Sequence, residues 1–330
     1  MKKKNTLLKF IVGAAATVGL IHIANRAVNY MATKGGRLSS VKGNFFHWRN
    51  GDFFYQVTGS GKPLVLLHDI TISSSAYEWK KVVRELSAGH TVYVVDLPGC
   101  GRSAKDAITY IGFYYVQFIQ AFLRDIVREK ADIIAVGRSA SIAVSTTSFD
   151  NSLIDQLILV TPQKIEPLTD LRPLSSALLC RILRIPIIGT LIYHVLAGRR
   201  MIDKTLSEEK FYNPFDVDDT VLDSYVEAAH LGNDKGRFLL ASLIGGYMAV
   251  DISLALRRCR QRITLINGAK RADFKEVVGQ YRDVNTDIRD HAIEKACLLP
   301  HFEQPDLFVN AVNQILMDND AEASEEIFAE

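Results

Sequence analysis

The sequence predicts an α/β fold, built on a mostly parallel sheet with helices on both faces. From residue 43 onward, short apolar runs alternate with segments that have helical spacing. Runs such as PLVLLHD and ADIIAV are apolar throughout, as expected of strands covered on both faces. The chain has 330 residues, 48% of them hydrophobic, which is enough for one large domain with an insertion.

The expected elements follow one another in a regular order along the chain. A hairpin is predicted at 44–61, because Asn50-Gly51 is a typical turn between two alternating strands. Further strands are predicted at 63–69, 91–96, 131–136, 153–162 and 262–268, with a weak strand near 292–299. Helices are predicted at 75–90, 112–130 and 306–316, and the interval after residue 162 contains only helical patterns.

The first 42 residues form a basic segment that contains an apolar run. The segment carries eight lysine and arginine residues and no acid, so its charge is +8 and the charge of the remainder is 2 − 8 = −6. Its stretch from Thr6 to Ala24 is 19 residues long and nearly reaches the length that crosses a bilayer. We expect an uncleaved membrane anchor whose orientation stays undetermined. A signal peptide and a buried or interfacial helix are the alternatives.

Charge and cysteine content narrow the classes of function. An acidic body with an acidic last stretch, 317–330, has no basic surface for nucleic acid. The four cysteines show no C-x-x-C spacing, so neither a zinc site nor another cofactor is expected.

The sequence divides into five parts. We expect a basic segment with the anchor helix at 1–42, the first half of a core at 43–162, a helical insertion at 163–258, the second half of the core at 259–318 and an acidic tail at 319–330.

Several short motifs, taken in order, resemble the α/β-hydrolase fold family. They are LVLLHD, VVDLPGCGRS, VGRSAS, LING and LPHFEQP, and the resemblance covers roughly residues 43–318. It implies an eight-stranded sheet, a serine hydrolase type of site and a helical cap formed by the insertion.

Gly137-Arg138-Ser139-Ala140-Ser141 resembles the family's nucleophile elbow, a tight turn from strand to helix. The resemblance places Ser139 at the tip of the turn. It implies an oxyanion hole formed by the Ala140 N–H group and by the loop after His68, near Asp69 or Ile70.

The partners that this serine needs depart from the family pattern. Where the family commonly has the acid, this chain has Arg271, and Asp273 follows two residues later. Where the family commonly has the histidine base, this chain has Leu298, and His301 corresponds to a second, supporting histidine. Ser139, His301 and Asp273 are therefore an irregular candidate triad.

Asp69 and Arg138 are further departures beside the predicted serine. A carboxylate at position 69 would repel a developing oxyanion unless it turns away, towards Arg138 or His68. Arg138 either recognises an anionic substrate or pairs with Asp69.

Three hypotheses about function remain open. The first is a membrane-anchored serine hydrolase that cleaves an ester or related acyl bond in an apolar small molecule. The second is a catalytically impaired member that binds a small apolar ligand or a protein partner under its cap. The third is a membrane-tethered interaction protein that keeps the fold only as a scaffold, because fold alone does not determine function.

Overall fold

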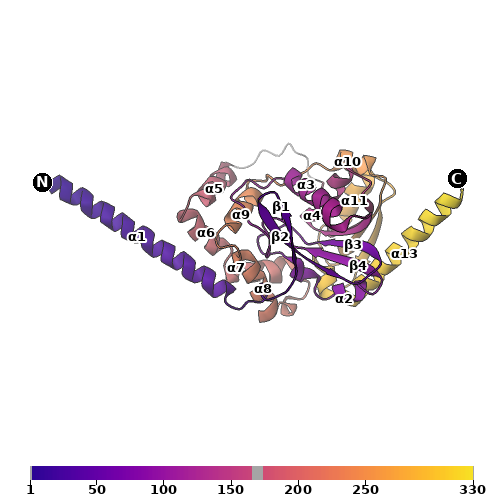
Figure 1. The fold of residues 1–330 in the computed structure, drawn as a ribbon, viewed down its shortest axis with the longest axis horizontal. Helices are drawn as coiled ribbons and strands as arrows, with labels where there is room; N and C mark the ends of the chain where they lie inside the picture. Colours follow the sequence, from indigo (N-terminus) through magenta and orange to yellow (C-terminus); the bar gives the residue numbers. More distant parts are fainter. Residues whose placement is uncertain (1, 166–173, 330) are drawn as a thin grey trace.

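One sheet of eight strands forms the centre of the molecule (Figure 1). The computed structural model describes residues 2–165 and 174–329, with side chains for 16–165 and 176–319. The strand order is β1-β2-β4-β3-β5-β6-β7-β8; β2 pairs antiparallel with β1 and β4, and the other pairs are parallel. The predicted fold class is thus confirmed. The strands are β1 Asn44–Trp48, β2 Gly51–Thr58, β3 Lys62–Leu67, β4 His90–Val95, β5 Ala131–Val136, β6 Ile154–Val160, β7 Arg262–Gly268 and β8 Arg289–Ile293.

Helices cover both faces of the sheet because its central strands are apolar on both sides. Val65 and Leu67 of β3 pack into one buried cluster with α3, α4 and α11, whereas Leu64 and Leu66 pack into the other with α2 and α13. The core helices are α2 Val83–Leu86, α3 Gly112–Phe122, α4 Arg138–Thr147, α10 Ser253–Arg258, α11 Phe274–Val284, α12 Pro300–Glu303 and α13 Pro305–Ala329, with short helical turns η1 Ala76–Trp79 and η2 Leu123–Val127.

Three predicted elements differ from those in the structure. The helix expected at 75–90 is reduced to η1 and α2, because this stretch packs as two short turns around the buried Trp79. The weak strand lies earlier than predicted, at β8, where it pairs with β7 through residues that carry little apolar signal. The acidic tail continues the last helix, since α13 runs to Ala329.

A helical cap is inserted between β6 and β7. Its elements are α5 Leu174–Arg184, α6 Ile188–Leu196, α7 Arg199–Thr205, η3 Leu206–Lys210, η4 Pro214–Asp216, α8 Asp219–His230 and α9 Gly236–Ile244. The end of η3 is fastened to the loop before α12: the Leu298 N–H donates to the Lys210 carbonyl at 3.0 Å. Glu303 accepts from the N–H groups of Cys297 at 2.8 Å and Tyr212 at 2.5 Å, which joins the same two segments.

The N-terminal helix α1, Lys2–Thr33, extends away from the body, and its last turns lie against the cap helices α6 and α8 (Figure 1). The side chains of Lys2, Lys3, Lys4 and Lys9, and those of the tail beyond 319, lie outside the described part. The chain that follows α1 is held by the buried Glu227, which accepts from the Leu38 and Ser39 N–H groups, both at 3.1 Å.

Among the described helices, none alone has the length and apolar composition needed to cross a bilayer. The bent pair Ser176–Arg184 and Ile188–Leu196, whose axes meet at 117°, has that length and composition when taken together.

Candidate functional site

The bend between β5 and α4 lies at Gly137. This glycine has φ 59° and ψ −120°, a conformation that L side chains rarely adopt, and α4 begins at the next residue. Ser139 is already inside the first turn of α4 and does not have a positive φ. The prediction that Ser139 stands at the tip of the elbow is therefore wrong. The strand β5 ends two residues earlier than it would if the bend lay at Ser139. The residue at the tip is a glycine and has no nucleophilic side chain.

The Ser139 hydroxyl is engaged inside the protein. Its side chain is fully buried, and Oγ donates to the carbonyls of Val136 at 2.8 Å and Leu67 at 3.2 Å. These contacts tie the first turn of α4 to the ends of β5 and β3. The Ala140 N–H, predicted as an oxyanion donor, is used in the helix and reaches the Gly137 carbonyl at 3.3 Å. It is not free to bind an oxyanion.

The carboxylate of Asp69 occupies the position next to the tip of the bend. Its Oδ1 accepts the Arg138 N–H at 2.9 Å, and this is the N–H group of the residue that follows the tip. In the hydrolase fold, the N–H group at that position helps to form the oxyanion hole. A Cβ atom added to Gly137 would lie 2.5 Å from Asp69 Oδ1, so a side chain at the tip and this carboxylate exclude each other. The carboxylate of Asp69 therefore does not turn away from the oxyanion position, as the sequence analysis required, because it accepts the main-chain N–H of Arg138.

Lys210, at the end of η3, brings a positive charge from the cap to this carboxylate. Its Nζ lies 3.6 Å from Asp69 Oδ2, and both side chains are largely shielded from solvent. Burial alone would raise the pKa of Asp69, but the charges of Lys210 and Arg138 and the N–H groups of Arg138 and Ile70 outweigh it. The pKa of Asp69 is therefore lowered, and the carboxylate is ionised at neutral pH.

His68 and Ile70 hold the loop that carries Asp69. Both residues are fully buried. His68 Nε2 accepts the Leu97 N–H at 3.0 Å, which leaves Nδ1 to donate to the Asp69 carbonyl at 2.7 Å. The ring therefore connects the loops that follow β3 and β4. Both ring nitrogens are hydrogen-bonded to the main chain, so neither is available as a catalytic base.

His301 lies in an aromatic environment away from any hydroxyl partner. Its ring is fully buried, and the ring centroid is 4.3 Å from that of Trp79 and 5.6 Å from that of Phe308. Burial, together with the charge of Lys210, lowers the pKa of His301 to about 3, so the ring is neutral. Neither ring nitrogen has a hydrogen-bond partner among the described residues.

Asp273 pairs with Arg271, the residue at the family's acid position. Arg271 Nε lies 2.5 Å from Asp273 Oδ1, and its Nη1 donates to the Pro162 carbonyl at 2.7 Å. The hydrogen bond from Arg271 is the main reason that the pKa of Asp273 is lowered. The structure thus does not bring Ser139, His301 and Asp273 together, and their catalytic role stays a prediction without a supporting contact.

A set of buried polar groups lies near Lys210. Glu78 is fully buried, burial raises the pKa of its carboxyl, and neither oxygen has a hydrogen bond of good geometry, although the Ser74 and Tyr225 hydroxyls are close. The described contacts also leave Trp79 Nε1, the Tyr225 hydroxyl, Lys210 Nζ and both nitrogens of His301 without hydrogen-bond partners. We call Glu78, Trp79, Lys210, Tyr225 and His301 the buried polar cluster.

His301 is the only member of the buried polar cluster that was predicted from the sequence as a site residue. Glu78 and Trp79 lie in a stretch predicted as an ordinary amphipathic helix, and Lys210 and Tyr225 lie in the cap, where no motif marks them. A lone acid between two aromatic residues, Tyr77 and Trp79, was the one available signal.

Comparison with known proteins identifies the family. The sequence model of the alpha/beta hydrolase family matches residues 64–311, and this chain therefore belongs to that family. No match was found among curated protein sequences.

Solved structures with the same fold are hydrolases of several kinds. A serine hydrolase involved in carbazole degradation superposes with a TM-score of 0.69 at 16% identity, covering 84% of this chain and 98% of its own. An esterase from Thermogutta terrifontis gives 0.68 at 16% identity, over 84% and 98%. A bacterial membrane phospholipase A gives 0.67 at 16% identity, over 96% and 99%. At these identities the likeness concerns the fold.

Proposed function

We propose that this protein is a member of the hydrolase family that binds a small polar ligand under its cap without forming a covalent acyl intermediate. The observation that carries the proposal is the pair formed by Gly137 at the bend and the Asp69 carboxylate on the Arg138 N–H. The position of the nucleophile lacks a side chain, and a negative charge stands where an oxyanion would need donors.

The alternative of an ester hydrolase that uses Ser139 lacks the contacts its chemistry needs. A hydroxyl is a weak nucleophile at neutral pH and requires an adjacent base. Ser139 donates to two main-chain carbonyls, and His301 is neutral, buried and packed against the Trp79 ring. Loss of the base alone costs roughly 10⁶ in turnover in a well-studied serine protease.

The buried polar cluster supports the binding part of the proposal. Buried donors and acceptors in folded proteins nearly always have partners, because an unpaired buried group costs about 1–3 kcal/mol. Glu78, Lys210 and Tyr225 all present such groups close to one another. A small polar ligand that donates to and accepts from these groups would remove that cost. The ligand proposed here is polar, whereas the sequence analysis expected an apolar ligand.

The membrane association expected from the sequence belongs to the same proposal. The run from Phe10 to Ala24 is apolar, basic residues lie on either side of it, and α1 extends away from the body (Figure 1). Apolar helices flanked by basic residues bind anionic bilayer surfaces. The fold likeness to a membrane phospholipase A includes 96% of this chain, which also favours a protein that works at a membrane.

Labelling with a fluorophosphonate probe tests the catalytic part. We expect no labelling of the folded wild type beyond that of Ser139→Ala, and equal, negligible turnover of 4-nitrophenyl esters by both. Labelling of the wild type that disappears in Ser139→Ala would overturn the proposal.

A thermal-shift screen of small polar compounds tests the binding part on the wild type and on Tyr225→Phe. Because the Tyr225 hydroxyl makes no hydrogen bond of good geometry with a described residue, its removal should leave the ligand-free Tm unchanged or slightly higher. Compounds that stabilise the wild type should stabilise Tyr225→Phe less. Equal shifts in the two proteins would exclude the buried polar cluster as the binding site.

A further inference from the structure

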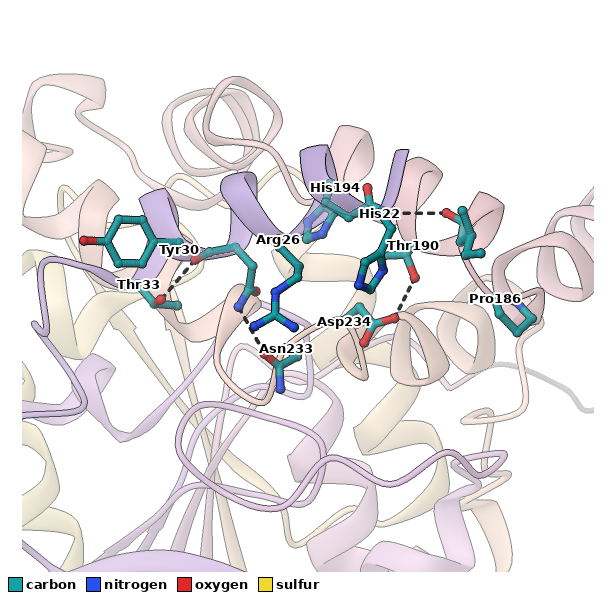
Figure 2. Close-up of a pocket in the computed structure, with 12 residues that line it drawn as sticks. His22, Arg26, Tyr30, Thr33, Pro186, Thr190, His194, Asn233 and Asp234 are labelled. Carbon is teal, nitrogen blue, oxygen red and sulfur yellow. Dashed lines mark hydrogen bonds between the residues drawn. The ribbon is translucent and has the colours of Figure 1, made fainter. Parts of the chain in front are cut away.

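A pocket lies between α1 and the cap, and neither Lys210 nor Asp69 lines it. It has a volume of about 720 Å³ and is lined by α1, the start of α6 and the loop after α8 (Figure 2). Figure 2 shows the His22 and Arg26 side chains extending from α1 towards the loop that holds Asn233 and Asp234. We call this site the α1–cap pocket.

The walls of this pocket are held together by polar contacts. Asn25 Nδ2 donates to the Ile187 carbonyl at 3.3 Å, and Asn29 Nδ2 lies 3.5 Å from Asn233 Oδ1. The buried Glu227 fixes the chain immediately after α1 through its bonds to Leu38 and Ser39. The pocket therefore follows from the docking of α1 on the cap.

The charged groups of the pocket leave one positive charge uncompensated. Asp234 accepts from the Thr190 hydroxyl at 2.6 Å and from the buried guanidinium of Arg237, so its charge is balanced within the protein. Arg26 is exposed and makes no hydrogen bond or ion pair with any described residue. A guanidinium presents several donors in a fork that fits phosphate, and here that fork faces an open cavity.

His194 adds a neutral donor or acceptor to the wall. Its ring stacks on that of His230 at 5.2 Å, and Nδ1 is buried without a partner among the described residues. Burial lowers the pKa of His194 to about 4, so the ring contributes a hydrogen bond and not a charge at neutral pH.

The surroundings of the pocket select an amphiphilic ligand. Ile23 of α1 and Ile188 and Leu191 of α6 are large apolar side chains that are 65%, 51% and 39% exposed. Arg26 lies two residues after the apolar run Phe10–Ala24 ends, and a basic residue at the end of such a run lies at the depth of the lipid headgroups. A phosphate held by Arg26 would therefore continue into acyl chains that lie along apolar surface.

We propose that the α1–cap pocket binds the phosphate of an anionic membrane phospholipid, with Arg26 as its principal donor. The inference rests on the proposed membrane association and adds a headgroup site to it. The proposal predicts that binding depends on Arg26 in particular. A general attraction between basic residues and an anionic surface would not distinguish Arg26 from other basic residues.

The test measures binding of the full chain to phosphatidylcholine vesicles with and without phosphatidylglycerol. Arg26→Gln is compared with Lys34→Gln, which removes the same charge from an exposed position just after the same helix. We expect Arg26→Gln to weaken binding to phosphatidylglycerol vesicles by about tenfold, and Lys34→Gln to bind like the wild type within about twofold. Circular dichroism verifies that both variants are folded.

Each other outcome has a distinct meaning. Equal losses in the two variants would overturn the headgroup site and leave membrane association standing. A wild type that binds no vesicles would overturn both. Calorimetric titration with inorganic phosphate tests whether free phosphate is the ligand instead. If inorganic phosphate binds as strongly as the vesicle lipid, the pocket is a site for soluble phosphate, and the proposal of a lipid ligand is overturned.

Discussion

At the scale of single residues, the bend between β5 and α4 decides what chemistry the site can perform. Gly137 adopts φ 59° and ψ −120°, and the space beside it is filled by the carboxylate of Asp69. Ser139, the serine predicted to react, lies half a helical turn further along the chain. Its hydroxyl is already engaged in hydrogen bonds to main-chain carbonyls. The same short motif is therefore compatible with two positions of the bend, and only one of them exposes a hydroxyl.

We expect Gly137→Ala to destabilise the protein by about 2 kcal/mol or more. The new Cβ would meet Asp69 Oδ1 at 2.5 Å and would also force an alanine into a strained conformation, which costs about 1–3 kcal/mol. Gly279→Ala in α11 is the control, because nothing lies within 4 Å of its new Cβ and alanine favours the helix. Urea denaturation measures both. A Gly137→Ala variant as stable as Gly279→Ala would contradict the geometry at the bend.

The buried His301 makes stability depend on pH. Its pKa is about 6.5 when unfolded and about 3 when folded, so the unfolded chain binds more protons between these values, and stability falls as the pH falls. From pH 6.5 to 5 this residue should cost about 2 kcal/mol. His301→Phe should remove that part of the slope in urea denaturation, since Trp79 and Phe308 already surround the ring with aromatic groups. His291→Phe, at an exposed position, should keep the wild-type slope. An unchanged slope in His301→Phe would show that the ring is solvated.

At the scale of elements, the Asp69–Lys210 ion pair joins the exit of β3 to the end of η3. Asp69→Asn leaves the Lys210 ammonium without its counter-charge in a shielded position, and we expect a loss of about 3–5 kcal/mol. Lys210→Met removes the partner charge, and the double variant Asp69→Asn/Lys210→Met should be more stable than Asp69→Asn alone. Denaturant titrations of the four proteins measure the coupling, and additivity within about 0.5 kcal/mol would contradict a direct interaction.

The docking of α1 on the cap is a second feature at this scale. Glu227→Ala removes the acceptor for the Leu38 and Ser39 N–H groups and should free the segment after α1. Limited trypsin digestion should then cleave after Lys34 and Arg37, both exposed, several-fold faster than in the wild type. Glu208→Ala, at an exposed cap position, is the control and should not change the rate. Equal cleavage rates in Glu227→Ala and the wild type would show that Glu227 does not hold this segment.

Elements with strong local signals were predictable, and those shaped by long-range packing were not. Apolar runs located β3 to β7 and the Asn50-Gly51 turn located the first hairpin, because burial on both faces leaves a continuous apolar pattern. The strand β8 lies at the edge of the sheet and is mostly exposed, so its residues carry little such pattern. The bend at Gly137 depends on where β5 ends against β6, which a local motif does not specify.

The residues of the site were likewise predictable only where a local motif marks their positions. Arg271 and Leu298 could be recognised as departures because they fall at marked positions in the motifs. Lys210 comes to Asp69 from a cap element far along the chain, and Tyr225 comes to Glu78 in the same way. No spacing in the sequence connects these pairs.

At the scale of the whole molecule, the fold contains two candidate sites that share no residue. One lies where the strands of the parallel sheet end, beneath the cap, and contains Asp69, Lys210 and the buried polar cluster. The other lies between the cap and α1 and contains the unpaired Arg26 (Figure 2). The basic segment and the acidic body give the molecule a charge asymmetry of +8 against −6. Under the proposed membrane association, this asymmetry would turn α1 towards an anionic surface.

The central claim, that position 139 is enclosed and position 137 forms the bend, is tested most directly by the reactivity of a thiol in Ser139→Cys. Alkylation by iodoacetamide is followed for each cysteine by peptide mass spectrometry. The chain supplies its own standards, since Cys100 and Cys180 are buried whereas Cys259 and Cys297 are partly exposed. The account predicts that Cys at position 139 reacts as slowly as Cys100 and Cys180. A rate equal to or above that of Cys297 would place this side chain in the open site and contradict the account.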